Sequence, residues 1–345
     1  MSSYQNIGQM NAQMVTRRGF TNTGGRVIKA RDGKMSTGLA FLRGELEKVD
    51  EKIRQPLSTK SWTRDLPVKT GGGWVETISA MGIQYGIQGG GMEDSIIAGG
   101  VNEIPVIQAD MNKDVYKTHV FAAVMRVGWV DMQKSQITSR SLEQMATDGI
   151  RAAYDKHMDR NGYLGFTKYD CYGLLNNPEV TVSEVADGAS KKKTWKDKTP
   201  DEILYDINNA ILRGWENAGW DLDAIPNHIV IPYEQLNYIS TTRIGELAEK
   251  TILSFLLENN TAKANGVDLQ ICAAMYAKGA GVGGTDRMVC YVNDDYFIAV
   301  EELVPLKRAI TETKTDTVSF DSVYVANVSE VELFYNQPIT YWDGI

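Results

Sequence analysis

The sequence predicts a mixed α+β fold, and three observations support this class. Runs with helical spacing of apolar residues alternate with short β-rich runs through the second half of the 345-residue chain. A composition of 43% hydrophobic and 23% charged residues is typical of a globular protein. The first hundred residues, in contrast, are polar or glycine-rich and show little periodicity. We therefore expect a packed body preceded by extended appendages.

Residues 1–38 predict an extended arm that becomes ordered only against a partner. This segment has a net charge of +5, from six basic residues and one acidic residue, whereas the whole chain has −8, which leaves −13 for the remainder. Two interpretations remain open: a solvated tail, or a basic arm that lies on an acidic neighbour or on nucleic acid. The acidic body argues against DNA binding as the main role.

After the arm, apolar residues at helical steps predict a short helix over Leu39–Ile53, which Pro56 ends. The next segment, Gly71–Gly100, contains ten glycines in thirty residues, with β-type pieces at Trp74–Ile78 and Gly82–Ile87. Glycine has no side chain to pack and is costly to order, so this segment cannot form a core of its own. We expect either a projecting two-stranded loop or a flexible surface loop.

From Glu103 the chain becomes strand-like, and the apolar run His119–Val130 predicts a buried strand near the centre of a sheet. A long amphipathic helix follows, and Ser139–Val180 holds this helix, a Gly-Leu-Leu-Asn turn and a proline. We expect one stripe of the helix to face the sheet: Leu142, Met145, Ala146, Gly149, Ile150, Ala153 and His157.

The second half predicts a compact domain of helices and strands. Thr199 with Pro200 and Glu202 forms a capping box that starts a helix, and its buried stripe is Ile203, Leu204, Ile207, Ile211 and Trp215. A further helix is expected over Thr242–Glu258. The lysine-rich residues 190–198 are expected to form an exposed loop. Strands are expected at Val180–Val185, His228–Pro232, Val267–Ala273, Arg287–Val292, Tyr296–Val300, Thr317–Phe320, Tyr324–Asn327 and Val331–Tyr335.

The residues give no support for catalysis, a cofactor or a metal. The turn Gly279–Gly284 matches the dinucleotide-binding glycine pattern by letter, but it leads into a strand instead of a helix. The histidines His119, His157 and His228 have no spacing that pairs two of them on one helical face. Three cysteines without a C-x-x-C spacing favour neither a disulfide framework nor a thiolate metal site. We assign no catalytic, cofactor-binding or metal-binding residue.

The order of parts resembles the major capsid proteins of tailed bacteriophages of the Hong Kong 97 type. The features that carry the resemblance are an arm, a short helix, a glycine-rich projecting loop, a strand, a long helix and the turn Gly173-Leu174-Leu175-Asn176. The resemblance extends from about Leu39 to the C-terminus. It implies an α+β capsid fold with an N-terminal arm, an extended β-hairpin loop, a peripheral domain with a long spine helix, and an axial domain.

By this resemblance we expect an arm with a short helix at 1–60 and the extended loop region at 61–112. The peripheral strand and spine helix follow at 113–172, the axial domain at 173–310, and C-terminal strands that return to the peripheral domain at 311–345. Tyr172–Pro178 would form the hinge into the axial domain. Lys60 and Lys69 flank the loop, but Gly71–Asn112 contains no lysine, so covalent cross-linking through the loop is not expected.

The resemblance implies a structural shell protein without enzymatic activity, part of the virion and assembled in the host cytoplasm. It would form hexamers and pentamers of an icosahedral head around double-stranded DNA, with scaffolding, portal and decoration proteins as further partners. Two alternatives remain: an encapsulin-like nanocompartment shell, and a nucleotide-dependent enzyme that uses the Gly279–Gly284 turn. No export signal or membrane-spanning stretch is expected from the apolar pattern.

Overall fold

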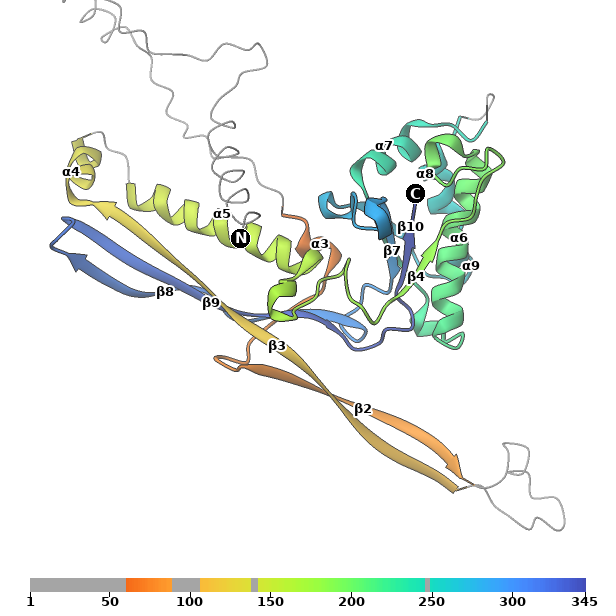
Figure 1. Ribbon diagram of the computed structural model, residues 1–345, viewed down its shortest axis with the longest axis horizontal. Helices are drawn as coiled ribbons and strands as arrows, with labels where there is room; N and C mark the ends of the chain where they lie inside the picture. The colour runs from red at the N-terminus through yellow and green to blue at the C-terminus, as the bar shows by residue number, and fades with distance from the viewer. Residues whose placement is uncertain (1–59, 89–105, 138–141, 246–248) are drawn as a thin grey trace, which may run out of the picture. The chain divides into compact units, whose positions relative to one another are not determined.

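The computed structural model describes residues 60–88, 106–137, 142–245 and 249–345 (Figure 1). These residues belong to one compact unit, Leu57–Ile345. The basic arm and the expected helix Leu39–Ile53 lie outside the described residues. Two five-stranded sheets organise the unit, and helices cover both. The mixed α+β class is thus confirmed.

The first sheet has the strand order β1-β8-β9-β3-β2. Its strands are β1 (Val68–Thr70), β2 (Thr77–Gln88), β3 (Val106–Gly128), β8 (Ile298–Lys314) and β9 (Ser319–Leu333). β2 and β3 pair antiparallel over Thr77–Gln88 and Val106–Lys117. The two-stranded form expected for the glycine-rich segment is therefore confirmed, although the tip, residues 89–105, lies outside the described residues.

β3 continues past the hairpin and pairs with β9 from Thr118 to Gly128. The expectation of a buried central strand at His119–Val130 is wrong, because this half of β3 forms the edge of the sheet and has one exposed face. Val120 and Val124 are each more than half exposed, whereas Met125 and Val127 are buried. A continuous apolar run can therefore mark a strand with one face covered and the other left apolar but open.

Two helices follow β3: α4 (Trp129–Ile137) and the long α5 (Leu142–Leu164), which runs along one face of the first sheet (Figure 1). Leu142, Ala146 and Ile150 pack against Met125, Val127 and Tyr324. The predicted stripe is only partly correct, because Met145, Gly149 and Ala153 are exposed. Burial is deepest at the C-terminal end of α5, at Tyr154, Met158, Asn161, Gly162 and Tyr163.

The turn Gly173-Leu174-Leu175-Asn176 closes the C-terminal end of α5. The backbone amides of Leu174 and Leu175 donate to the carbonyls of Gly162 and Tyr163, and the Asn176 amide donates to the carbonyl of Leu164 at 2.7 Å. These carbonyls have no partner inside the helix, so the turn satisfies them. A Cβ on Gly173 would lie 2.4 Å from the Tyr163 carbonyl carbon, which explains the glycine.

The second sheet has the order β4-β10-β7-β5-β6. Its strands are β4 (Thr181–Glu184), β5 (His228–Ile231), β6 (Gln270–Ala273), β7 (Arg287–Tyr291) and β10 (Thr340–Asp343). A single apolar core joins both sheets, because Val300 and Val328 of the first sheet belong to the same cluster as Val230 and Val289 of the second. The β4 to β7 strands agree with the sequence-based strand positions to within a few residues.

The helices beside the second sheet are α6 (Pro200–Asn217), α7 (Tyr233–Thr241), α8 (Ile252–Glu258) and α9 (Thr261–Ala264). The capping box of α6 is confirmed: the Thr199 amide donates to the Glu202 carboxylate at 2.8 Å. Among the described residues of the helix expected at Thr242–Glu258, only Ile252–Glu258 are helical, capped by the Thr251 side chain, and α7 was not predicted. Among the described helices, none is both long and apolar enough to cross a membrane.

The C-terminal strands are longer and more continuous than expected. β9 is one strand where three pieces were predicted, and β8 extends to Lys314 instead of ending at Val300. Ile298–Lys314 belongs to the first sheet and Thr340–Asp343 to the second. Figure 1 shows β8 and β9 as a long hairpin beside β3.

Candidate assembly surfaces

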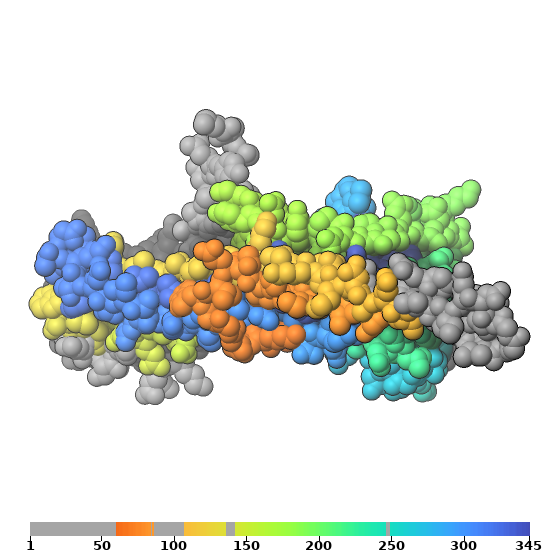
Figure 2. All heavy atoms as spheres, turned by 90° about the horizontal axis from the view of Figure 1, so that it is seen from below, coloured from red at the N-terminus to blue at the C-terminus, as the bar shows by residue number. Residues whose placement is uncertain are grey.

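The β2–β3 hairpin has one mainly apolar face, which also carries Lys113 and contacts no core. Ile83 lies opposite Met111 and Tyr85 opposite Ala109 in the ladder, so their side chains share a face. The large apolar side chains of this face are between 55% and 73% exposed: Met81, Ile83, Tyr85, Ile107, Met111 and Val115. Figure 2 shows β2 and β3 uncovered on the side seen there. An isolated two-stranded ribbon is marginally stable in water, so this face requires a partner.

The opposite face of the hairpin is polar. It includes Asp110, Asn112 and Asp114 on β3, which pair with β2 residues of the same face. All three are exposed. The hairpin is therefore amphipathic, and its apolar side is the side that would be buried in an assembly.

The first sheet presents a second apolar surface, on the face opposite α5. In the ladder, Ala122 lies beside Val325 and Val124 beside Val323, which in turn lies beside Ile310 of β8. Val120, Val124 and Ile310 are each more than half exposed. Both faces of the sheet are thus apolar in this region. α5 covers one of them, and residues 73–75 cover the other at Asn327, while Val120, Val124 and Ile310 remain open.

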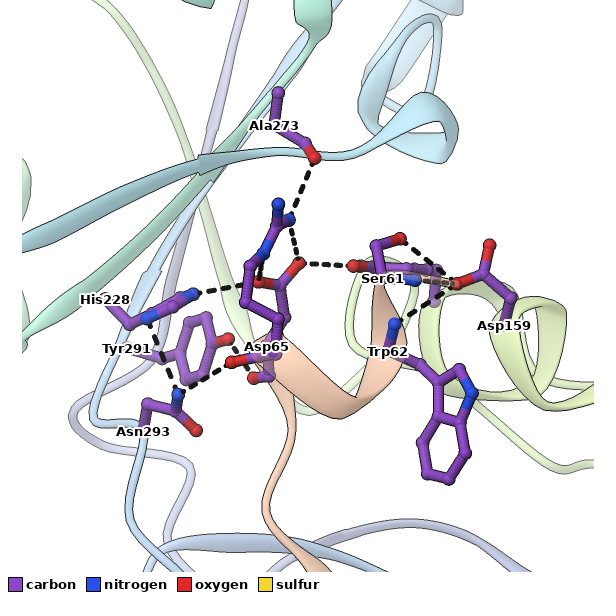
Figure 3. A network of polar contacts seen from close by, with 10 residues as sticks. Ser61, Trp62, Asp65, Asp159, His228, Ala273, Tyr291 and Asn293 are labelled. Atoms are coloured by element: carbon purple, nitrogen blue, oxygen red, sulfur yellow. Dashed lines mark hydrogen bonds and ion pairs between the residues drawn. The ribbon is translucent and has the colours of Figure 1, made fainter. Parts of the chain in front are cut away.

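A buried polar network attaches the segment before the hairpin to α5 and to β5 of the second sheet (Figure 3). The helix α3 (Trp62–Asp65) carries Asp65, which is fully buried. Its carboxylate accepts two hydrogen bonds from Arg64, at 2.6 and 2.7 Å, one from Tyr163 of α5, and one from His228 of β5 at 3.1 Å. The Tyr291 hydroxyl donates to the Asp65 carbonyl.

Hydrogen bonding determines the charge state of this network. Burial alone would raise the pKa of Asp65, but the hydrogen bonds from Arg64, His228 and Tyr163 outweigh it and lower the pKa to about 2. Burial raises the pKa of Tyr163 well above its usual range, so this hydroxyl keeps its proton and donates. At the other end of α3, Asp159 of α5 accepts the Ser61 and Trp62 amides at 2.9 and 3.2 Å.

Asp65, His228 and Cys272 form a cluster whose ligand atoms lie within 4.8 Å of one another. The donor chemistry nevertheless favours a purely hydrogen-bonded site. Each Asp65 oxygen already accepts two hydrogen bonds, and the Asn293 amide lies 3.5 Å from His228 Nδ1, which places the histidine proton on Nε2, toward Asp65. The Arg64 guanidinium also occupies the approach to the carboxylate. The cluster therefore acts as an anchor for α3.

His119 of β3 and His157 of α5 are in contact, although their positions in the sequence did not predict a pair. His119 Nε2 lies 3.1 Å from His157 Nε2, and His157 stacks on Phe166 with ring centroids 4.8 Å apart. Burial lowers the pKa of each ring to about 4, and the neighbouring His157 and Arg160 add to the effect on His119 and His157 respectively. Both rings are therefore neutral near pH 7, and one can donate to the other.

A buried carboxyl lies near the end of β9. Glu332 is fully buried, and neither of its carboxylate oxygens has a hydrogen-bond partner among the described residues. Burial raises its pKa to about 7, and the charges of Glu301 and Glu330 act in the same direction, while the nearby Ser329 hydroxyl and Lys69 oppose them. No local pattern identifies this residue, because an acid within an alternating strand normally faces solvent.

The Gly279–Gly284 turn has no free phosphate-binding geometry in the structure. Its 3₁₀ turn, Val282–Gly284, leads into β7, as the sequence predicted. The Val282 amide already donates to the Asp343 carboxylate at 2.9 Å, and Asp343 also pairs with Arg287 at 2.7 Å. The Asp343 carboxylate thus already accepts the hydrogen bond from the backbone amide that a phosphate would need.

Sequence reasoning identified the projecting ribbon and the Gly-Leu-Leu-Asn turn but missed the polar anchor. Arg64 and Asp65 are adjacent, but Tyr163 and His228 lie far from them in the chain, and none of the four belongs to a recognisable motif. Only the fold brings them together, so no local pattern could have predicted the contact. The same reason explains the unpredicted His119–His157 pair.

The fold matches solved capsid structures. Over 91% of this chain and 100% of the other, it superposes on the capsid protein of the Myoviridae phage XM1 with a TM-score of 0.71 and 16% identity. A capsid structure of the empty GTA particle gives a TM-score of 0.59 at 11% identity, covering 90% of this chain and 99% of that one. The encapsulin of Synechococcus elongatus gives 0.52 at 11% identity, covering 88% and 95%.

These matches define the molecule as a protein of the Hong Kong 97-type capsid fold. The model of the family described as "Major capsid protein" matches residues 93–345, so the chain belongs to that family. No curated protein matches the sequence. The family is structural, and the chain is a shell subunit that assembles with copies of itself, not an enzyme.

Proposed function

We propose that this chain forms the head of a tailed bacteriophage, as hexamers and pentamers of an icosahedral shell around double-stranded DNA. The observation that carries the proposal is the amphipathic β2–β3 hairpin, whose apolar face has no partner among the described residues of its own subunit. A second copy would supply one, because each subunit also offers the open apolar face around Val124 and Ile310. Repetition of this contact by rotation would build a closed shell.

The phage assignment has more support than the alternatives. Among the three structures compared, the phage XM1 capsid gives the highest TM-score and is matched over its full length. A nanocompartment shell shares the fold and remains the main alternative. Scaffolding, portal and decoration proteins, and assembly in the host cytoplasm, belong to the same proposal, as does the division into arm, loop, peripheral domain and axial domain.

Electron microscopy of the purified full-length protein tests the proposal. Closed shells or capsomer rings are expected, whereas a dispersed small particle at high concentration would contradict it. Expression together with the neighbouring genes then separates the alternatives. A portal-bearing particle filled with double-stranded DNA supports the phage head, and a particle filled with a cargo enzyme supports the nanocompartment.

A hairpin-deletion variant tests whether the ribbon drives assembly. Ile78 and Tyr116 are paired across the ladder, so residues 79–115 can be replaced by Asn-Gly to give a short hairpin. This design keeps the hydrogen bond from the Tyr116 hydroxyl to the Leu333 carbonyl. The variant should remain folded by circular dichroism and lose assembly. Normal shells from the variant would exclude the hairpin as the assembly element.

A further inference from the structure

An acidic hollow lies at the C-terminal end of α6. It has a volume of about 950 Å³ and is lined by residues after α6, by the turn before β8 and by the segment between β9 and β10. Three carboxylates line it, those of Asp221, Asp223 and Asp294, and no lysine or arginine is found among its lining residues. Tyr296 and Tyr335 stack at its wall with ring centroids 5.4 Å apart. The hollow is therefore suited to a cationic guest.

The end of the helix strengthens this character. α6 ends at Asn217, and the helix dipole gives this end a partial negative charge. Asp221 and Asp223 follow within six residues and are both exposed. Leu222 between them is 67% exposed, which adds an apolar contact at the rim. An occupant would thus need basic groups together with an aliphatic or aromatic portion.

A cationic loop of residues 190–198 lies at the other end of the same helix. Trp195 and Lys198 hold this loop from inside: both are buried, and both donate to Asp206 of α6, at 3.1 and 2.5 Å. Lys191 and Lys196 are exposed, and neither forms an ion pair with any described residue. The loop therefore presents two unpaired cations on a fixed turn.

The two sites cannot meet within one subunit through α6 itself. The helix has 18 residues, which separates its ends by about 27 Å. A contact between the loop of one copy and the hollow of the next would join different surfaces of identical subunits. Such head-to-tail contacts generate rings when the rotation closes. At every contact around the ring, the positively charged loop of one copy would face the negatively charged hollow of the next.

We propose that the lysine loop at the N-terminal end of α6 docks into the acidic hollow at the C-terminal end of α6 in the neighbouring copy, and so sets the rotational order of the capsomer ring. This inference rests on the proposed function, because it requires self-assembly. Lys191 and Lys196 would approach Asp221 and Asp223, with the tyrosine pair as an aromatic wall.

Charge reversal in the full-length protein tests the contact. Lys191→Glu with Lys196→Glu, or Asp221→Lys with Asp223→Lys, should raise the protein concentration needed for assembly by on the order of tenfold. Combining all four substitutions should restore assembly, because the reversed charges attract again. Lys156→Glu on the exposed side of α5 is the matched control and should assemble normally. Circular dichroism and thermal unfolding establish that each variant is folded.

A disulfide readout separates failure of the inference from failure of the proposed function. In the double variant Lys191→Cys and Asp223→Cys, oxidation of assembled protein should give a covalent ladder up to the ring size, and each single variant should not. If wild-type protein forms shells but reversed variants assemble normally and no ladder appears, the docking contact is excluded. If wild-type protein forms no shells at all, the proposed function itself is contradicted.

Discussion

At the scale of single residues, buried charge has the largest consequences. Asp65 is fully buried, yet it is ionised because Arg64, His228 and Tyr163 all donate to it. Glu332 is equally buried but has no partner among the described residues, so its ionised form is disfavoured. The two carboxyls therefore shift stability in opposite directions with pH.

We predict that Glu332→Gln stabilises the unassembled subunit at pH 8 but not at pH 4. The folded-state pKa is about 7 against 4.5 in the unfolded chain, so wild-type stability falls as pH rises between these values and stays low above 7. The gain at pH 8 should be on the order of 3 kcal/mol. Urea unfolding at both pH values measures it, and Glu312→Gln, at an exposed position of β8, is the control.

We predict that Asp65→Ala destabilises the subunit by about 3–5 kcal/mol, because the buried donors of His228 and Tyr163 and the guanidinium of Arg64 lose their acceptor. The stabilisation from Asp65 is present above its unfolded pKa near 3.8 and is lost as pH falls toward 2. Asp295→Ala should change stability by less than about 1 kcal/mol, because Asp295 forms only an exposed pair with Lys69. Similar losses from both variants would contradict an anchoring role.

At the scale of elements, the sequence predicted the ribbon, the long helix and the capped helix α6. These elements carry local signals: glycine clusters around β-type residues, apolar residues at three- and four-residue steps, and a capping box. The sequence did not predict that β3 is one strand of 23 residues, because the length of the strand and its pairing partners depend on contacts with distant segments of the chain. The exposed apolar face at Val120 and Val124 was mistaken for a core, since an apolar run does not reveal what covers it.

We predict that polar substitutions on the apolar face of the hairpin block assembly without unfolding the subunit. Ile83→Asp with Met111→Asp places two charges at opposed positions that are already exposed in the monomer, so stability should change by less than about 1 kcal/mol. Assembly should fail because those charges would be desolvated at a copy-to-copy contact. Asn112→Asp on the polar face is the control. Electron microscopy of both variants shows whether shells form. Assembly of the first variant into shells would show that the apolar face of the hairpin is not buried between copies.

At the scale of the whole molecule, one core spans both sheets, while the hairpin extends beyond it. A ribbon without a core is expected to open locally in the free subunit and to become protected when a neighbour covers it. We predict that chymotrypsin cleaves unassembled protein near Tyr85, which is 73% exposed, and that assembled shells resist this cleavage. Mass spectrometry of the fragments locates the cut. Equal cleavage in both states would mean that the hairpin is not covered by assembly.

The continuity of β3 also determines how the subunit bears mechanical load. The strand is joined to β2 over twelve residue pairs and to β9 over eleven, with no break between the two ladders. A pull along the hairpin would load these ladders in shear, so that many hydrogen bonds would have to break together instead of one after another. Tension between neighbouring subunits would thus pass directly into the sheet beneath α5, and the shell would resist stretching through its backbone.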